Sequence, residues 1–264
     1  MKEQRSQVCD QSYENADLTI LSKMQARAYH IVESHFTDLS QVKDPPALII
    51  NGGAGTGKSY LINAIRTLTR DKCAITATTG KTAFNINGIS IHSLLKLRVG
   101  TKVSKDLTGQ SLIRLQEMLS GIDYIIIDEY SMLGQMNFGW IDKRCKQAPG
   151  FIDKLLGNKS INFCGDLGQL HPVGDKPLYH AIPTNSIGEE SHFAYQMFNR
   201  VVKLSTKEYR DMTLCKLVLE SCSYSLGKVN STTSTLRTCK NIKMRLGYSL
   251  VMKKLAIITM NNFE

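Results

Sequence analysis

No apolar run in the 264 residues approaches the roughly 18 residues that a membrane-spanning helix needs, so we expect none. The first 18 residues lack the apolar core of a secretory signal peptide and are too acidic for a typical mitochondrial presequence. The seven cysteines include no C-x-x-C pair, which argues against a zinc site and fits a reducing compartment. We therefore expect an intracellular protein.

The chain also has a deficit of acidic residues: 33 lysines and arginines stand against 23 acids, a net charge of +10. This balance favours a polyanionic partner, either nucleic acid or an anionic membrane surface, although solubility alone explains it equally well. The hydrophobic content of 42% is ample for one large domain, or for one domain with an appendage.

Short apolar runs alternate with helical patterns along the chain. The runs typical of buried strands are 47–50, 73–76, 124–127 and 161–164, and the helical patterns are 59–68, 112–119 and 132–146. An earlier helix has Met24, Ala28, Ile31 and Val32 on one face, with Ser22 and Gln25 forming a capping box at its start. This alternation predicts an α/β domain with a parallel sheet flanked by helices.

The two ends of the chain differ from the middle. Residues 1–17 are predicted to be a disordered lead. From residue 221, Ser and Thr cluster, and seven lysines and arginines stand against one acid, Glu264. We therefore separate a basic tail, 213–264, which contains no motif that we can place.

A phosphate-binding loop stands between the first predicted strand and the next helix. It matches G-x-x-x-x-G-K-[ST], with the residues Gly52, Gly53, Ala54, Gly55, Thr56, Gly57, Lys58 and Ser59. Glycines let backbone N–H groups approach phosphate oxygens, and the helix N-terminus adds positive potential. Lys58 would contact the β- and γ-phosphates of ATP, and the Ser59 hydroxyl would ligate Mg²⁺.

The apolar run 124–127 ends in two carboxylates, Asp128 and Glu129. Beside a P-loop, Asp128 is expected to hold Mg²⁺, directly or through water, and Glu129 to orient and deprotonate the attacking water. The second acid favours ATP hydrolysis over phosphoryl transfer to a metabolite. A GTPase is disfavoured because the nearest base-reading string, 158–161, lacks its aspartate.

The segment 165–173, Gly-Asp-Leu-Gly-Gln-Leu-His-Pro-Val, follows the fourth predicted strand. Here the chain resembles superfamily 1 helicases, specifically the Pif family of DNA helicases. Other matching segments occur in the expected order: Gln25 upstream of the P-loop, 78–86 with 91–95 as motif Ia, 128–132 as Walker B, and 202–204 leading to 209–210. The resemblance implies a RecA-like motor domain over residues 18–212.

The resemblance also implies roles for individual residues. Gln25 would read adenine, and Gln169 would sense the γ-phosphate. Arg210 would stabilise charge on the γ-phosphate. Single-stranded DNA would lie near Thr79, Lys81 and His92.

Simpler alternatives exist for several of these roles. Gln25 could act only in the capping box, His92 could be a core histidine, and Lys81 a solvated charge. Asp211 could pair with Arg210 and divert it, since the family usually has Gln there. His171 replaces the first of two prolines common in the family, which should alter loop stiffness more than chemistry.

The implied function is an ATP-dependent DNA helicase that couples ATP hydrolysis to 5′-to-3′ unwinding in DNA repair, recombination and telomere maintenance. Its expected cofactors are ATP and Mg²⁺, its partner is single-stranded or forked DNA, and its location is nuclear, with no membrane partner. The family's later motifs, a His-Lys-Ser-Gln-Gly-like and a Leu-Ser-Arg-like string, are absent from the sequence. Residues 213–264 are too few for a second motor domain. The alternative is a truncated ATP- and DNA-binding fragment without unwinding activity.

Overall fold

The computed structural model describes residues 16–40, 44–98, 104–147, 153–183 and 185–205. The tail 213–264, Arg210 and nearly all of the predicted lead lie outside these ranges. None of the helices within the described ranges has the length and apolar character needed to cross a bilayer.

Six parallel strands form one sheet in the order β3-β2-β4-β5-β1-β6. Their bounds are β1 Leu48–Gly52, β2 Cys73–Ala77, β3 Ile89–Ser90, β4 Tyr124–Asp128, β5 Ser160–Gly165 and β6 Arg200–Leu204. The central strands β4 and β5 are buried along their whole length. Burial on both faces explains why they are apolar runs rather than alternating patterns. The predicted α/β class and four of the strands are confirmed.

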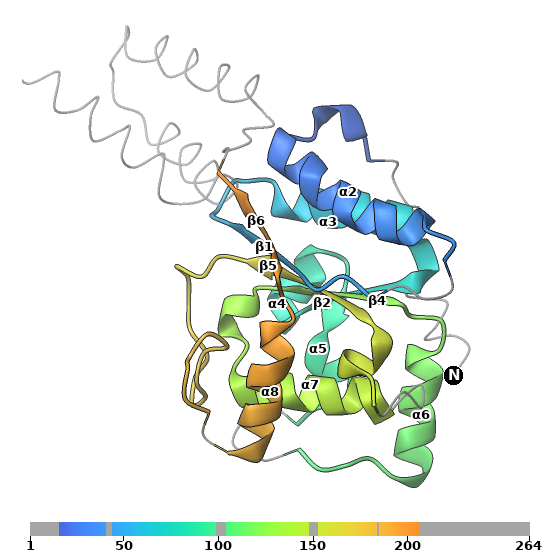
Figure 1. Cartoon of the computed structure of the whole chain (residues 1–264), viewed down its shortest axis with the longest axis vertical. Coiled ribbons are helices and arrows are strands. Elements are labelled where there is room, and N and C mark those ends of the chain that lie inside the picture. Colours follow the sequence, from blue (N-terminus) through green and yellow to red (C-terminus); the bar gives the residue numbers. More distant parts are fainter. Residues whose placement is uncertain (1–15, 41–43, 99–103, 148–152, 184, 206–264) are drawn as a thin grey trace, which may run out of the picture. The chain divides into compact units, whose positions relative to one another are not determined.

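Helices cover both faces of the sheet (Figure 1). One face carries α2 Lys23–Thr37 and α3 Lys58–Thr69, and the short α4 Gly80–Asn85 contributes to the same core cluster. The other face carries α5 Ile91–Leu94, α6 Gly109–Leu119, α7 Gln135–Gln147 and α8 Ser186–Gln196. This arrangement leaves the carboxyl ends of the strands as the edge on which loops can build a site.

The capping box at the start of α2 is confirmed. Ser22 Oγ accepts a hydrogen bond from the Gln25 backbone N–H at 3.4 Å, and Gln25 Oε1 accepts one from the Ser22 N–H at 2.9 Å. Of the predicted apolar face, Ala28 and Val32 are fully buried, and Met24 and Ile31 pack against the same core cluster.

Besides the short elements β3, α4 and α5, two longer elements that belong to the core were not predicted from the sequence. Strand β6 alternates buried Val202 and Leu204 with exposed residues, so it shows no continuous apolar run. Helix α8 has a polar first turn that begins at its cap, Asn185. The predicted helix 132–146 also starts too early, because a 3₁₀ turn at 130–132 and the buried Gly134 precede α7.

Candidate nucleotide-binding site

The P-loop lies between the end of β1 and the start of α3, where the sequence places it. Gly55 and Gly57 have φ values of +78° and +74°, a region that residues with a Cβ rarely adopt. Gly57 is also the N-cap of α3 and provides no side-chain hydrogen bond to the helix. The first N–H groups of α3 are thus not capped by a side chain, which suits binding of an anion.

Gly52 permits close packing beneath the loop. A Cβ at this position would lie 2.6 Å from Thr56 Oγ1 and 2.9 Å from Leu204 Cβ. Thr56 Oγ1 instead donates to the Gly53 carbonyl at 2.8 Å, which closes the loop on itself. The P-loop is therefore packed against the last residue of β6, an element that the sequence pattern did not reveal.

Gln25 fastens the loop to α2. Its side chain is fully buried, and its Nε2 donates to the Thr56 carbonyl at 2.9 Å while its Oε1 completes the capping box. An amide retains one further N–H and one further lone pair after these two bonds. The structure thus shows Gln25 as a cap and a tether, and the adenine contact stays a prediction.

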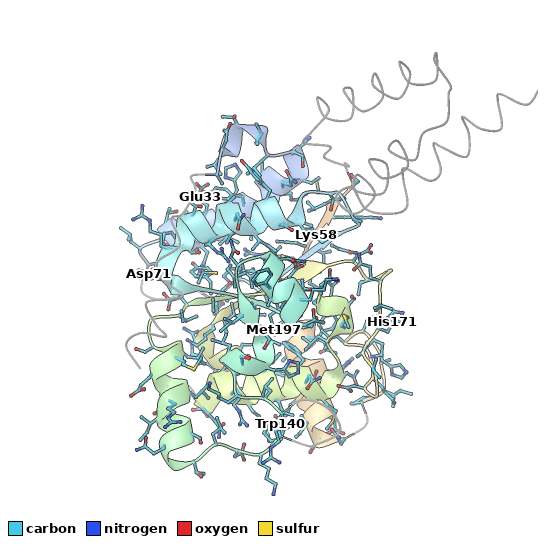
Figure 2. The ribbon with its side chains drawn as sticks, turned by 180° about the vertical axis from the view of Figure 1, so that it is seen from behind. Glu33, Lys58, Asp71, Trp140, His171 and Met197 are labelled. Carbon is cyan, nitrogen blue, oxygen red and sulfur yellow. The ribbon has the colours of Figure 1, made fainter. Side chains whose placement is uncertain are left out.

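Lys58 directs its side chain back over the loop. Its Nζ donates to the carbonyl of Gly52 at 2.7 Å and to that of Gly53 at 3.1 Å. Figure 2 shows Lys58 at the start of α3, and Ser59, which follows it, is exposed to solvent. Of the two side chains that the sequence assigns to phosphate and metal, Lys58 therefore contacts the P-loop and Ser59 is accessible to solvent.

Asp128 is the last residue of β4 and is only 5% exposed. Burial raises the pKa of its carboxyl to about 6, and the charge of Glu129 adds to this, whereas the Glu129 N–H and the Lys58 charge act in the opposite direction. The N–H bond to Asp128 Oδ1 measures 2.9 Å. A buried carboxylate whose pKa of about 6 still leaves it ionised at neutral pH is suited to bind a hard divalent cation.

Glu129 occupies a strained position directly after the strand. Its φ is +56°, which is uncommon for a residue with a side chain and costs about 1–3 kcal/mol. Thr78 supports this geometry from the end of β2, because its N–H donates to the Asp128 carbonyl and its hydroxyl to the Glu129 carbonyl, both at 3.2 Å. Thr78 begins the motif Ia segment 78–86, but its local sequence does not indicate this contact.

The loop after β5 brings Asp166 and Gln169 to the same edge of the sheet. Asp166 Oδ1 accepts from the Gly168 N–H, and the Asp166 carbonyl accepts from the Gln169 N–H, each at 3.0 Å. A Cβ on Gly53 would lie 3.6 Å from Asp166 Oδ2, so this carboxylate faces the P-loop. Asp166 belongs to the motif segment 165–173, and its place beside the P-loop is not evident from the sequence.

The same loop is fastened to the start of α7. Asp175 Oδ2 accepts from the N–H groups of Met136 at 2.9 Å and Asn137 at 3.4 Å. The fully buried Gln135 donates its backbone N–H to the Lys176 carbonyl at 2.9 Å and its side-chain N–H to the His180 carbonyl at 2.6 Å. The loop carrying Gln169 is therefore tied to the helix that follows the Walker B segment.

The predicted DNA-contacting residues lie toward the β3–β2 edge. Thr79 caps α4, its Oγ1 accepting from the Thr82 N–H at 3.2 Å, and Lys81 is exposed, without an ion pair to any described residue. His92 on α5 is half-buried, and this burial lowers its pKa. The structure thus leaves the alternatives for Lys81 and His92 open.

His171, which stands where the resemblance leads us to expect a proline, lies in the loop after β5 (Figure 2). His171 is exposed, and its ring lies edge-on to Tyr179 with centroids 6.3 Å apart. Its neighbours Leu170 and Val173 are 72% and 96% exposed. This part of the loop therefore presents apolar side chains to solvent, while Asp175 anchors its base.

Asp128→Asn is expected to raise the stability of the protein while it removes the carboxylate that is predicted to hold Mg²⁺. The pKa of this carboxyl is 3.8 in the unfolded chain and about 6 in the folded protein, so ionisation opposes folding as the pH rises through that interval. The difference is equivalent to about 3 kcal/mol at pH 7. Thermal unfolding in EDTA should show that the variant has a higher free energy of unfolding than the parent. The increase should be up to this size at pH 7 and absent below pH 4.

The matched control is Asp123→Asn, which changes an exposed carboxylate at the opposite end of β4. It should leave stability within about 0.5 kcal/mol of the parent. An equal gain in both variants would show that burial of Asp128 is not the cause.

A family model and individual curated proteins relate this chain to the same group of helicases. The family model for PIF1-like helicases matches residues 20–216. The ATP-dependent DNA helicase PIF4 of Trypanosoma brucei brucei is 37% identical over 140 residues, covering 50% of this chain and 17% of that protein. The ATP-dependent DNA helicase Pif1 of Campylobacter jejuni is 33% identical over 183 residues, covering 64% of this chain and 39% of that protein.

Solved structures agree in fold. Pif1 helicase from Candida albicans has a TM-score of 0.53 at 24% identity, covering 83% of this chain and 47% of that one. A Bacteroides Pif1 in complex with ADP-AlF3 and ssDNA has a TM-score of 0.51 at 21% identity, covering 72% of this chain and 43% of that one. The chain thus spans less than half the length of these relatives. Because the family model covers about three quarters of it, the chain belongs to the PIF1-like helicase family.

Proposed function

We propose that this chain is the ATP-binding motor domain of an ATP-dependent DNA helicase of the Pif type. The observation that carries the proposal is the convergence of three loops at one edge of the sheet. The P-loop follows β1, Asp128 ends β4 with Glu129 directly after it, and Asp166 to Gln169 follow β5. Because β4, β5 and β1 are adjacent parallel strands, their carboxyl ends face the same ligand.

The residues present fit ATP with Mg²⁺. The uncapped start of α3 and the glycines of the P-loop suit the phosphates, and Lys58 can exchange its two carbonyl contacts for phosphate oxygens. Ser59 and Asp128 would hold Mg²⁺, which neutralises charge on the phosphates when bound. Glu129 would take the proton of the attacking water, and Gln169 would sense the γ-phosphate.

The finer parts of the proposal rest on the resemblance to the family. We assign Arg210 to the γ-phosphate, and Thr79, Lys81 and His92 to single-stranded DNA. Forked DNA is the proposed substrate, with unwinding in the 5′-to-3′ direction. The proposed roles are in DNA repair, recombination and telomere maintenance, and the proposed location is nuclear.

A phosphate-release assay tests the ATPase part of this proposal. The purified chain should hydrolyse ATP slowly, and single-stranded oligonucleotide should accelerate it. Glu129→Gln should lower the rate by about 10²–10⁴-fold while ATP binding is retained, because it removes the general base and not the phosphate cradle. Unchanged hydrolysis in this variant would contradict the role of Glu129.

Binding of single-stranded DNA should depend strongly on salt. The net charge is +10, and neutralisation of phosphates makes the logarithm of affinity fall linearly with the logarithm of salt concentration. Base stacking should contribute little, because the motif Ia segment offers only one exposed aromatic side chain, Phe84. The affinity for a labelled oligothymidylate, measured by anisotropy at salt concentrations between about 50 and 200 mM, tests this prediction. An affinity that does not change with salt concentration would refute it.

A second candidate function is an ATP- and DNA-binding protein that does not unwind DNA by itself. It is favoured by the coverage, since the chain spans 17% and 39% of the two curated helicases described above. The absence of the two later motifs from the sequence points the same way.

A further inference from the structure

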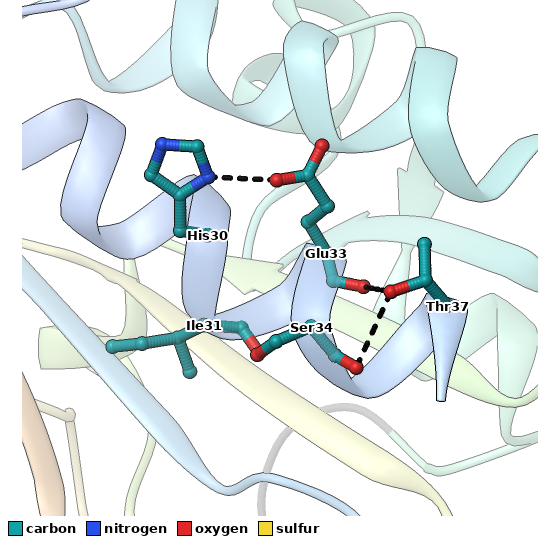
Figure 3. Close-up of polar contacts among 5 residues, drawn as sticks. All are labelled: His30, Ile31, Glu33, Ser34 and Thr37. Atoms are coloured by element: carbon teal, nitrogen blue, oxygen red, sulfur yellow. Dashed lines mark hydrogen bonds and ion pairs between the residues drawn. The ribbon is translucent and has the colours of Figure 1, made fainter. Parts of the chain in front are cut away.

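A row of polar and cationic side chains runs along the solvent side of α2. Lys23, Arg27, His30 and Ser34 are spaced by four, three and four residues, which places them on one face of the helix. All four are exposed, whereas Ala28 and Val32 on the opposite face are in the core. Figure 3 shows part of this row, with His30 and Ser34 on successive turns of α2.

The row borders an open groove with a volume of about 610 Å³. Arg200, the first residue of β6, closes the groove on the other side, and Ala26 and Ile31 supply apolar surface. Ile31 is partly buried and packs against the core cluster beneath α2, so this apolar surface is fixed in place. We call this feature the α2–β6 groove.

The charge of the α2–β6 groove is positive and largely uncompensated. Lys23, Arg27 and Arg200 form no ion pair with any residue in the described part of the chain. His30 is different, since its Nδ1 lies 2.7 Å from Glu33 Oε2 (Figure 3). No acidic residue lines the groove among the described residues.

The groove is separate from the nucleotide site and from the predicted DNA contacts. Arg200 pairs in register with Leu48 at the start of β1, whereas the P-loop follows the other end of that strand. Thr79 and Lys81 follow β2, toward the opposite edge of the sheet from β6. The motor reaction proposed above therefore gives no role to this surface.

The combination of an apolar floor and a cationic rim favours a peptide over nucleic acid. Among the residues that the structure describes, no Phe, Tyr or Trp lines the groove, so these residues offer bases no aromatic platform on which to stack. Ala26 and Ile31 instead suit an aliphatic or aromatic side chain, and the three cations suit carboxylates. The chain's own tail is a poor occupant, since it carries seven basic residues against one acid from residue 221 onward.

We propose that the α2–β6 groove docks an acidic, extended segment of a partner protein that carries at least one large apolar side chain. The length of the row sets the size of this segment. From Lys23 to Ser34 the helix rises about 16 Å, because each residue contributes about 1.5 Å. An extended peptide covers that distance with about five residues.

The test uses a fluorescein-labelled synthetic hexapeptide, Asp-Asp-Leu-Asp-Asp-Phe, and anisotropy with the whole 264-residue chain. The double variant R27E/R200E should bind the peptide at least about tenfold more weakly, because two attractive charges become repulsive. The matched control R114E/K154E makes the same change in net charge at two exposed residues elsewhere, and it should bind like the parent. Both variants should bind a fluorescent ATP analogue like the parent, which shows that they are folded.

Two further arms identify the ligand class. A peptide with serine in place of the leucine and phenylalanine should bind several-fold more weakly, because it cannot cover Ala26 and Ile31. Unlabelled oligothymidylate should not displace the hexapeptide. Equal loss of binding in R27E/R200E and R114E/K154E would overturn the proposal, since net charge alone would then explain it. Displacement by oligothymidylate would overturn it in favour of a nucleic-acid contact.

Discussion

Lys58→Ala is expected to weaken binding of ATP by at least about 100-fold. Lys58 is the mobile cation of the P-loop, and each charge-assisted hydrogen bond that it would make to a phosphate contributes about 1.5–3 kcal/mol. Two such bonds account for a loss of this size, since each 1.4 kcal/mol is a factor of ten. Titration with a fluorescent ATP analogue measures the change directly.

Two companion variants make this result specific. Lys72→Ala removes a lysine that pairs with Asp123 before the start of β2, at the far end of the sheet from the P-loop, and should leave ATP affinity unchanged. Ser59→Ala should weaken the dependence on Mg²⁺ more than it weakens binding itself. If Lys58→Ala binds ATP like the parent, the assignment of the P-loop is wrong.

The isolated 264-residue chain is expected to hydrolyse ATP about 10³–10⁵-fold more slowly than a two-domain member of the family, and not to separate strands. An arginine on the transferring phosphate contributes a factor of that size in related NTPases, and the motifs that would supply one from a second motor domain are absent from the sequence. Unwinding also requires two domains that close and open on one strand, which a single motor domain cannot do.

A fork-unwinding assay beside a phosphate-release assay on the purified chain provides the test. Addition of a second motor domain from a family member should restore part of the hydrolysis. Robust unwinding by the 264 residues alone would refute the expectation, because it would mean that the chain contains a second motor half without the family's late motifs.

Features that depend on residues close together in the sequence could be predicted, whereas features that depend on distant residues could not. Strands β1, β2, β4 and β5 were predictable because their burial produces continuous apolar runs, and the P-loop because its chemistry depends on neighbouring residues. Strand β6 was missed because alternate residues are exposed. Its packing against Gly52 depends on the register between two strands far apart in the chain.

Other features of the site have no local signal at all. Asp175 is bonded to N–H groups 38 and 39 residues away in the sequence, and Thr78 reaches a carbonyl 51 residues away. Gln25 combines one local contact and one distant contact. Its capping box was predictable from spacing of three residues, whereas its bond to the Thr56 carbonyl, 31 residues away, was not. Contacts of this kind require the folded chain.

The packing of Leu204 against Gly52 has a mechanical consequence. Leu204 ends β6 and is paired in register with Gly52, and no room for even a methyl group separates them. A shift of the P-loop on gaining or losing nucleotide would therefore push directly on the end of the edge strand.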